Sequence, residues 1–273
     1  MKTRCNLHTH STYCDGKHTL EENVKQAILL GLDTIGFSSH APYGAHCTEG
    51  CLNEETIEKY RGEIIWLMQD YVDDIGVVLG IEQDIFSPSI DVISYDYVIG
   101  SVHYVKKGEE YVPIDYSPEK LGEGLRLCFG GDAYALAREY YRTVADVVNV
   151  TECDIIGHFD ILTKFNEKHP FIDENDRAYR NMALEATDAL LESGRLFEVN
   201  TGAMSRGWRQ NPYPADFILK RIISKGGRLI ITSDAHDASM LTSGFEETEE
   251  YLRTLGAREI WSFRYDEFFP LKL

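Results

Sequence analysis

Six of the nine histidines stand at or just after the ends of short apolar runs with the character of β-strands, and carboxylates accompany them. A single histidine in such a place is more typical of a hydrogen-bonded structural residue. Six together need a shared explanation, because clustered imidazoles repel when charged and each require a partner when neutral. Divalent metal ions provide one, since neutral imidazole and ionised carboxylate are their natural ligands. The candidate metal ligands are His8, His10, Asp15, His40, Glu82, His103, His158, Asp234 and His236.

The spacing within two short motifs supports a metal centre. In the HTH motif, His8 and His10 occupy positions i and i+2, which point to the same side of an extended chain and can bind one ion. Asp234 and His236 repeat that spacing in SDAH. An H-x-H pair alone is a weak signal, whereas H-x-H, Glu82 and D-x-H in this order strongly indicate metal binding.

The elements that must position these residues include a series of short strands. Strands that alternate with helices are typical of parallel β/α units, whose strands end at one common rim where active sites lie. The pattern predicts strands at 4–8, 34–38, 76–81, 97–102, 154–157, 195–199, 228–232 and 259–262.

Amphipathic stretches between these runs predict the helices. Their stop signals are consistent, because Gly31, Gly194 and Gly226 follow three of them. Pro214 suits the first turn of its helix, where a missing N–H is harmless. The predicted helices include 20–30, 54–71, 133–148, 175–192 and 214–224.

Seven or eight such units predict an α/β fold, and a closed barrel is favoured over an open doubly wound sheet. No linker, repeat or low-complexity run divides the chain, so we expect one domain over residues 1–273. The segment 105–131 breaks the alternation: it is polar, contains Gly and Pro, and reads as a long loop or small insertion.

The composition excludes several classes of partner. The formal net charge is −18 over 273 residues. Such a surface repels nucleic acid and anionic membranes, whereas a small anionic substrate remains compatible because metal ions invert the local field. The sequence lacks both an apolar run of about 18 residues and the apolar core of a signal peptide, so we expect a cytoplasmic protein.

The six cysteines are scattered, and only Cys47 and Cys51 are closely spaced, within CTEGC. A zinc knuckle usually has four ligands, so free thiols in a reducing compartment are favoured over a structural zinc site.

Together these motifs resemble the PHP family of metal-dependent phosphoesterases, named for polymerase and histidinol phosphatase domains. The matching segments are HTHSTYCDG, SSHAP, GIEQD, SVH, GHFD and SDAH, which run from residue 8 to residue 236. The resemblance implies a distorted (β/α)7 barrel with three divalent metal ions at the C-terminal rim of the strands. Zinc, manganese and iron suit these ligands about equally.

The resemblance also implies how the ligands are shared and how the reaction proceeds. A metal-bound hydroxide would attack phosphorus in line, without a covalent enzyme intermediate. Asp234 and His236 are the catalytic candidates for assisting the leaving alkoxide. Carried over by position, one ion would be held by His8, His10, Glu82 and Asp234, a second by Glu82, His103 and His158, and a third by Asp15, His40 and His236.

Within the family the likeness is greatest to the branch that hydrolyses L-histidinol phosphate to L-histidinol and phosphate in histidine biosynthesis. It is carried by IDYS after SVH, by EYYRTV, by GHFDILTKF, and by EVNTGAMSR before PYP. Lys164 and Arg206 are candidates for gripping the phosphate, although solvated surface charge is an equal alternative for each. Asp115 and Tyr116 are candidates for facing the cationic imidazole or amine of the substrate.

Two other functions remain open from the sequence. One is a PHP enzyme acting on another small phosphate ester or on nucleic acid, the latter disfavoured by the acidic surface. The other is a non-catalytic metal-binding regulatory protein, disfavoured because every expected ligand position holds a competent residue. The native metals, the oligomeric state and the conformation of 105–131 are also left open.

Overall fold

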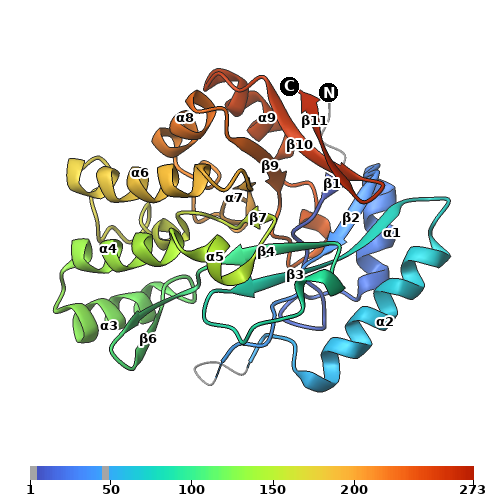
Figure 1. Ribbon diagram of the computed structural model, residues 1–273, viewed down its shortest axis with the longest axis horizontal. Coiled ribbons are helices and arrows are strands. Elements are labelled where there is room, and N and C mark those ends of the chain that lie inside the picture. Colours follow the sequence, from blue (N-terminus) through green and yellow to red (C-terminus); the bar gives the residue numbers. More distant parts are fainter. Residues whose placement is uncertain (1–4, 45–48) are drawn as a thin grey trace.

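A computed structural model describes residues 5–44 and 49–273 of the chain. Its main sheet is curled, and its strands follow one another around the sheet in chain order (Figure 1). All neighbours in the sheet are parallel except the last pair, β10 and β11. The strands are β1 Cys5–Asn6, β2 Thr34–Phe37, β3 Gly76–Asp84, β4 Tyr97–Ser101, β7 Ile155–Ile156, β8 Leu196–Asn200, β9 Arg228–Thr232, β10 Glu259–Arg264 and β11 Glu267–Lys272.

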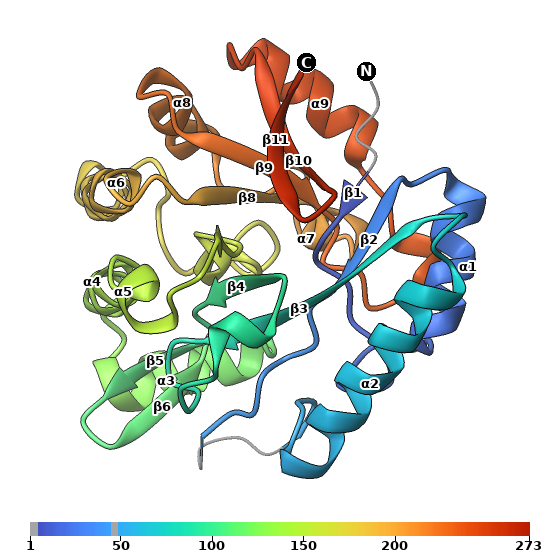
Figure 2. The same cartoon turned by 45° about the vertical axis from the view of Figure 1, so that its right-hand side comes forward.

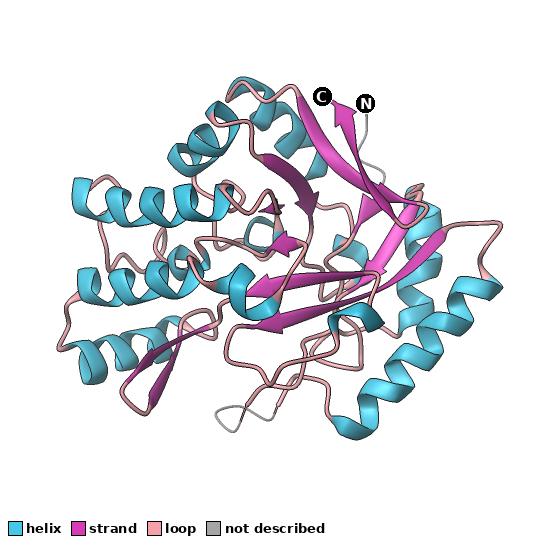
Figure 3. Ribbon diagram, viewed as in Figure 1, coloured by secondary structure: helices cyan, strands magenta, loops and turns pink. Residues whose placement is uncertain are grey.

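Helices surround the outside of this sheet, as Figure 2 and the secondary-structure colouring of Figure 3 show. Their apolar faces pack on the strands, and the buried residues between the two layers form the larger hydrophobic core. The α-helices are α1 Leu20–Leu30, α2 Glu54–Asp70, α3 Pro118–Phe129, α4 Ala133–Val144, α5 Val147–Thr151, α6 Arg177–Leu191, α7 Gly202–Ser205, α8 Asp216–Ser224 and α9 Phe245–Thr254.

The segments that follow β1 and β9 pair with each other at the rim where the strands end. Thr9, after β1, forms a parallel bridge with Ala235, after β9. The amide of His10 donates to the Ala235 carbonyl at 2.9 Å, and the Ala235 amide donates to the His8 carbonyl at 3.1 Å. The prediction of a distorted (β/α)7 barrel is confirmed, and the seam itself holds two of the candidate ligands.

A second, smaller core fills the inside of the barrel, and the ring of Tyr97 lies within it. Its hydroxyl donates to the Leu7 carbonyl at 2.5 Å. A β-carbon at Gly80 would lie 2.1 Å from this ring, and one at Gly36 would lie 2.5 Å from the hydroxyl oxygen. Glycine is therefore required at both positions for the tyrosine to fit.

Segment 105–131 has regular structure instead of forming a loop. It contributes to an antiparallel hairpin, β5 Tyr104–Lys107 with β6 Glu110–Pro113, followed by α3. Ser117 caps α3 by accepting from the amide of Lys120 at 3.2 Å, and proline occupies the first turn. Serine followed by proline is a helix-start signal, whereas the pairing of the two short strands is not visible in a polar sequence.

Three other predictions need correction. The expected helix 133–148 is two helices, because α4 ends at Val144 and α5 begins at Val147. Pro214 is not in the first turn of its helix, which begins at Asp216, because Tyr213 pairs back with Asn200. Strand β11 was not predicted; it completes a hairpin with β10 at the edge of the sheet.

Candidate metal centre

All nine predicted ligands lie together at the carboxyl ends of the barrel strands. Glu82 lies on β3 itself, while the others follow strand ends or lie in the loop before α1. The loop after β9 takes a sharp course, because Asp234 has a φ of 48°, a left-handed conformation that costs energy for a residue other than glycine. Such local strain is typical of functional sites and here places a carboxylate beside the histidines.

Glu82 is the centre of the first group, and its side chain is almost fully buried. One carboxylate oxygen, Oε2, faces the rings that come from β1 and β2, and the other, Oε1, faces those that follow β4 and β7. The facing atoms are His8 Nε2 at 3.2 Å, His10 Nε2 at 3.6 Å, His40 Nδ1 at 2.9 Å, His103 Nε2 at 3.3 Å and His158 Nε2 at 2.9 Å.

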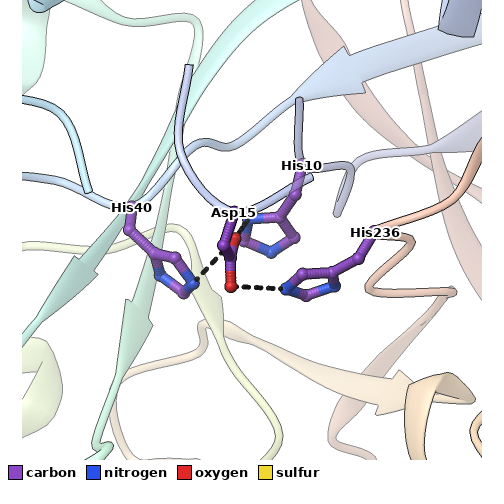
Figure 4. Close-up of side chains that lie close together, drawn as sticks. All are labelled: His10, Asp15, His40 and His236. Carbon is purple, nitrogen blue, oxygen red and sulfur yellow. Dashed lines mark hydrogen bonds and ion pairs between the residues drawn. The ribbon is translucent and has the colours of Figure 1, made fainter. Parts of the chain in front are cut away.

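A second group gathers around Asp15, as the close-up in Figure 4 shows. Its Oδ2 lies 3.1 Å from His236 Nε2, and its Oδ1 lies 3.7 Å from His40 Nε2 and 3.6 Å from His10 Nδ1. The His10 and His236 rings stack at 4.1 Å. One ligand atom from each of these residues fits within 4.8 Å of the others. The geometry therefore adds His10 to the set expected around Asp15.

The protein atoms alone do not satisfy this cluster. Among the described residues, His8 Nε2, His10 Nε2 and Glu82 Oε2 are buried without a hydrogen-bond partner. An unpaired polar atom in the interior costs about 1–3 kcal/mol, so several in one place call for a ligand. Imidazole nitrogens and carboxylate oxygens within coordinating reach of one another fit divalent metal ions.

The carboxylates of the cluster are held in the ionised form that metal ligands require. Burial alone would raise the pKa of Glu82, but the surrounding imidazoles, above all His8 and His40, hold it well below its ordinary value. The same competition operates at Asp234, where Arg206 and His8 outweigh burial and lower the pKa. Both side chains therefore offer lone pairs and no proton.

Two buried carboxylates behind the cluster were missed by the sequence reasoning. Asp84 accepts from the backbone amide of His103 at 2.7 Å, and its Oδ2 lies 3.2 Å from the ring Nδ1. Glu198, on β8, lies 2.5 Å from His8 Nδ1. A signal existed for each: Asp84 shares a strand face with Glu82 two residues away, and Glu198 is a lone charge in the apolar run LFEVN.

A cavity of about 700 Å³ opens in front of the cluster, and all four predicted substrate-binding residues line it. Lys164 Nζ donates to the Asp115 carbonyl at 2.8 Å and is 3.4 Å from that residue's carboxylate. Arg206 donates to the carbonyl and the carboxylate of Asp234, both at 3.0 Å. The Lys164 side chain is only 13% exposed, so solvated surface charge does not describe it. Tyr116 lies at the mouth and is 79% exposed.

Other polar side chains lie away from the cluster. Arg209 is buried and donates to Thr163 instead of reaching the cavity. His18 accepts from the Ala238 amide at 3.2 Å. Cys47 lies outside the described residues, so the CTEGC pair is not seen as a unit, and Cys5, Cys14, Cys128 and Cys153 are free thiols. Within residues 5–44 and 49–273, no helix combines the length and apolarity needed to cross a membrane.

Comparison with known proteins identifies relatives along nearly the whole chain. The PHP domain family matches residues 6–202. A Deinococcus radiodurans protein named "Probable histidinol-phosphatase" is 28% identical over 284 residues, covering 99% of this chain and 100% of its own. The histidinol-phosphatase of Bacillus subtilis is 24% identical over 261 residues, covering 88% of this chain and 96% of its own.

A solved structure shares the fold. The histidinol phosphate phosphatase of Lactococcus lactis, complexed with zinc, L-histidinol and phosphate, superposes with a TM-score of 0.74. The two chains are 22% identical, and the match covers 98% of this chain and 99% of that one. At this identity the likeness establishes the common architecture of the barrel.

Proposed function

The chain belongs to the PHP domain family, and on that premise we propose that it is a metal-dependent phosphatase that hydrolyses L-histidinol phosphate to L-histidinol and phosphate. The observation that carries the proposal is the convergence of nine candidate metal ligands at one rim, beside a cavity lined by the cationic side chains Lys120, Lys164 and Arg206. Relatives named histidinol-phosphatase over almost their full length support the substrate. The proposed setting is histidine biosynthesis in the cytosol.

The proposed cofactor is a set of three divalent ions, with zinc, manganese or iron as their identity. The Lactococcus neighbour, which holds zinc, supports zinc as the first to test. We assign one ion to His8, His10, Glu82 and Asp234, a second to Glu82, His103 and His158, and a third to Asp15, His40 and His236, with His10 close to the last set.

Bound ions of this kind polarise phosphate oxygens and make a coordinated water acidic enough to attack at neutral pH. The chain's own residues do the rest. Arg206, already oriented by Asp234, presents a guanidinium to the cavity, and Lys164, oriented by Asp115, presents an ammonium. Both stabilise charge that builds on the phosphate oxygens during transfer.

The leaving alkoxide of histidinol must receive a proton, and the surroundings of the two catalytic candidates decide how each can assist. The low pKa of Asp234 keeps it ionised, so it acts as a ligand and as the anchor of Arg206. His236 lines the cavity with its side chain 26% exposed, and its Nδ1 lies 3.1 Å from the Asp234 carbonyl. With Nε2 given to the third ion and the Nδ1 proton donated to that carbonyl, His236 would assist the leaving alkoxide as a ligand beside it, and the proton would come from the attacking water, which loses it on bonding to phosphorus.

The organic part of the substrate would lie against the far wall of the cavity. The residues that line the cavity away from the strand-end ligands include Tyr104, Tyr111, Tyr116 and Asp115. Burial alone would raise the pKa of Asp115, but Lys164 and His103 lower it, so the carboxylate is ionised. A cationic imidazole or amine is attracted both by the carboxylate and by the faces of the aromatic rings.

The test is phosphate release from L-histidinol phosphate by the metal-stripped and zinc-restored chain, beside a panel of simple phosphate esters. We expect zinc-dependent release that prefers histidinol phosphate, and no release by the double variant His8→Ala/His10→Ala. A tenfold better substrate in the panel would replace histidinol phosphate with another small ester. Full metal loading without any release would instead leave a non-catalytic metal-binding protein.

A further inference from the structure

Glu198 is a fully buried carboxylate on β8. It contacts His8 and His158, which are assigned to two different metal ions. We propose that Glu198 is a positioning residue that sets the orientation of His8 and His158 together, and so prepares both positions for their ions. The inference rests on the metal centre proposed above. It goes beyond that proposal because it gives a role to a side chain that lies behind the ligands.

The carboxylate of Glu198 is surrounded by four donors from different parts of the barrel. Oε1 accepts from the hydroxyl of Thr232 on β9 at 2.6 Å and from His8 Nδ1, after β1, at 2.5 Å. Oε2 accepts from the backbone amide of His158, after β7, at 2.5 Å and from the Asn200 side chain at 3.0 Å. An ionised carboxylate has only acceptor sites, so it satisfies all four.

The contact with His8 decides which ring nitrogen carries the proton. A proton on Nδ1 donates to Glu198, which leaves a lone pair on Nε2. That Nε2 lies 3.2 Å from Glu82 and 3.8 Å from Asp234, in the centre of the cluster. In the opposite tautomer, Nε2 would carry the proton and point an N–H at these carboxylates, so it would have no lone pair to bind a metal ion.

The contact with His158 acts through the backbone. Glu198 holds the amide of His158 at the point where the chain leaves β7, and the ring then reaches Glu82 with Nε2 at 2.9 Å. Both histidines are therefore tied to one rigid group on β8, and a change in that group displaces ligands of two ions at once.

Glutamine has the same shape but does not provide the same acceptors. Its amide would place an NH2 group against one of the two donor pairs, either His8 with Thr232 or the His158 amide with Asn200. Loss of a partner behind a metal ligand typically weakens metal binding about 10- to 100-fold. We expect Glu198→Gln to weaken zinc binding in this range.

The experiment measures zinc affinity by competition with a chromophoric chelator, together with the thermal melt of the metal-free chain by circular dichroism. The matched control is Asp160→Asn. Asp160 is equally buried and accepts from the Ala215 amide at 3.0 Å, but it makes no hydrogen bond to a proposed ligand. We expect the control to keep the parent's zinc affinity even where its melt is lower, and Glu198→Gln to lose affinity beyond any change in its melt.

Parental zinc affinity in Glu198→Gln, or an equal loss in the Asp160→Asn control, would overturn the inference. If Glu198→Gln does not fold, Glu198→Asp is compared in its place, because its shorter side chain cannot reach His8 and the His158 amide together. Failure of the parent chain itself to bind zinc would be a different result, since it would remove the proposed metal centre first.

Discussion

Arg206 and Arg209 are close in the sequence, yet their guanidinium groups face different parts of the molecule. Arg206 points into the cavity, where Asp234 orients it beside the metal ligands. Arg209 points away, donates to Thr163 and lies 3.6 Å from Glu174. The short helix α7, Gly202–Ser205, and the turn after it separate the two directions. One arginine is thus placed for substrate and the other for structure.

Replacing Arg206 with methionine should reduce kcat/KM for histidinol phosphate about 100-fold, because a preorganised donor to the phosphate oxygens is lost. Arg209→Met serves as the control. It should keep the activity of the folded enzyme but lower the free energy of unfolding by about 1–3 kcal/mol, because its buried partners lose a donor. Steady-state kinetics, zinc content and urea denaturation distinguish the two. Equal activity in both variants would remove Arg206 from the phosphate site.

Asp115 gives a test of specificity at a single side chain. Asp115→Asn should lower kcat/KM for histidinol phosphate about 10-fold or more, since a hydrogen bond to a charged group contributes about 1.5–3 kcal/mol. A simple ester without a cationic group should be hydrolysed nearly as before. The ratio of the two kcat/KM values is the measurement. A parallel fall for both substrates would mean that the Asp115 carboxylate acts only through its contact with Lys164.

Strands β2, β3 and β4 pack together inside the barrel through side chains of complementary size. The ring of Tyr97 on β4 occupies space left by Gly36 on β2 and Gly80 on β3, and its hydroxyl ties β4 to the chain after β1. The same β3 carries Glu82 two residues beyond Gly80. Packing at this level therefore fixes the strand that bears the central ligand.

Gly80→Ala should lower the free energy of unfolding by about 1–3 kcal/mol, because the new methyl group overlaps the Tyr97 ring. Gly62→Ala on the exposed side of α2 is the matched control: it meets no atom within 4 Å and should stabilise the helix by up to about 1 kcal/mol. Urea denaturation of both variants gives the comparison. Equal effects would contradict the packing described for the barrel interior.

The whole molecule carries a formal net charge of −18, and several of its carboxylates are gathered in the buried cluster. Divalent ions bound there would neutralise part of this charge and provide partners for the unpaired nitrogens. Ions held by the folded chain, and only weakly by the unfolded chain, would favour folding.

Zinc at about 100 times its dissociation constant should raise the free energy of unfolding by about 2.7 kcal/mol for each site filled. The comparison is a urea or thermal unfolding curve of the chelator-stripped chain with and without zinc. His8→Ala/His10→Ala should lose most of the effect. An unchanged unfolding curve would show that the cluster does not bind zinc in the folded chain.

The barrel and the common location of the ligands could be predicted from the sequence, because both depend on patterns among neighbouring residues. A strand or helix period is set by neighbouring residues, and parallel strands share a rim, so the positions of His8, Glu82, His158 and Asp234 after or on their strands already predict a common site. In the same way, the alternation of predicted strands and helices indicates a barrel, and the structure confirms it.

Contacts between distant segments were decided only by the tertiary structure. Three of the four donors around Glu198 come from segments far from it in the chain, and no local spacing relates them. Only Asn200, two residues away on the same strand, is a local neighbour. The directions of Arg206 and Arg209 depend on where α7 ends, and the hairpin of β5 and β6 depends on pairing that a polar sequence does not reveal. Residue types and the periodicity of strands and helices determine which side chains reach the rim of the barrel. The packing of distant segments determines which of their atoms face one another there.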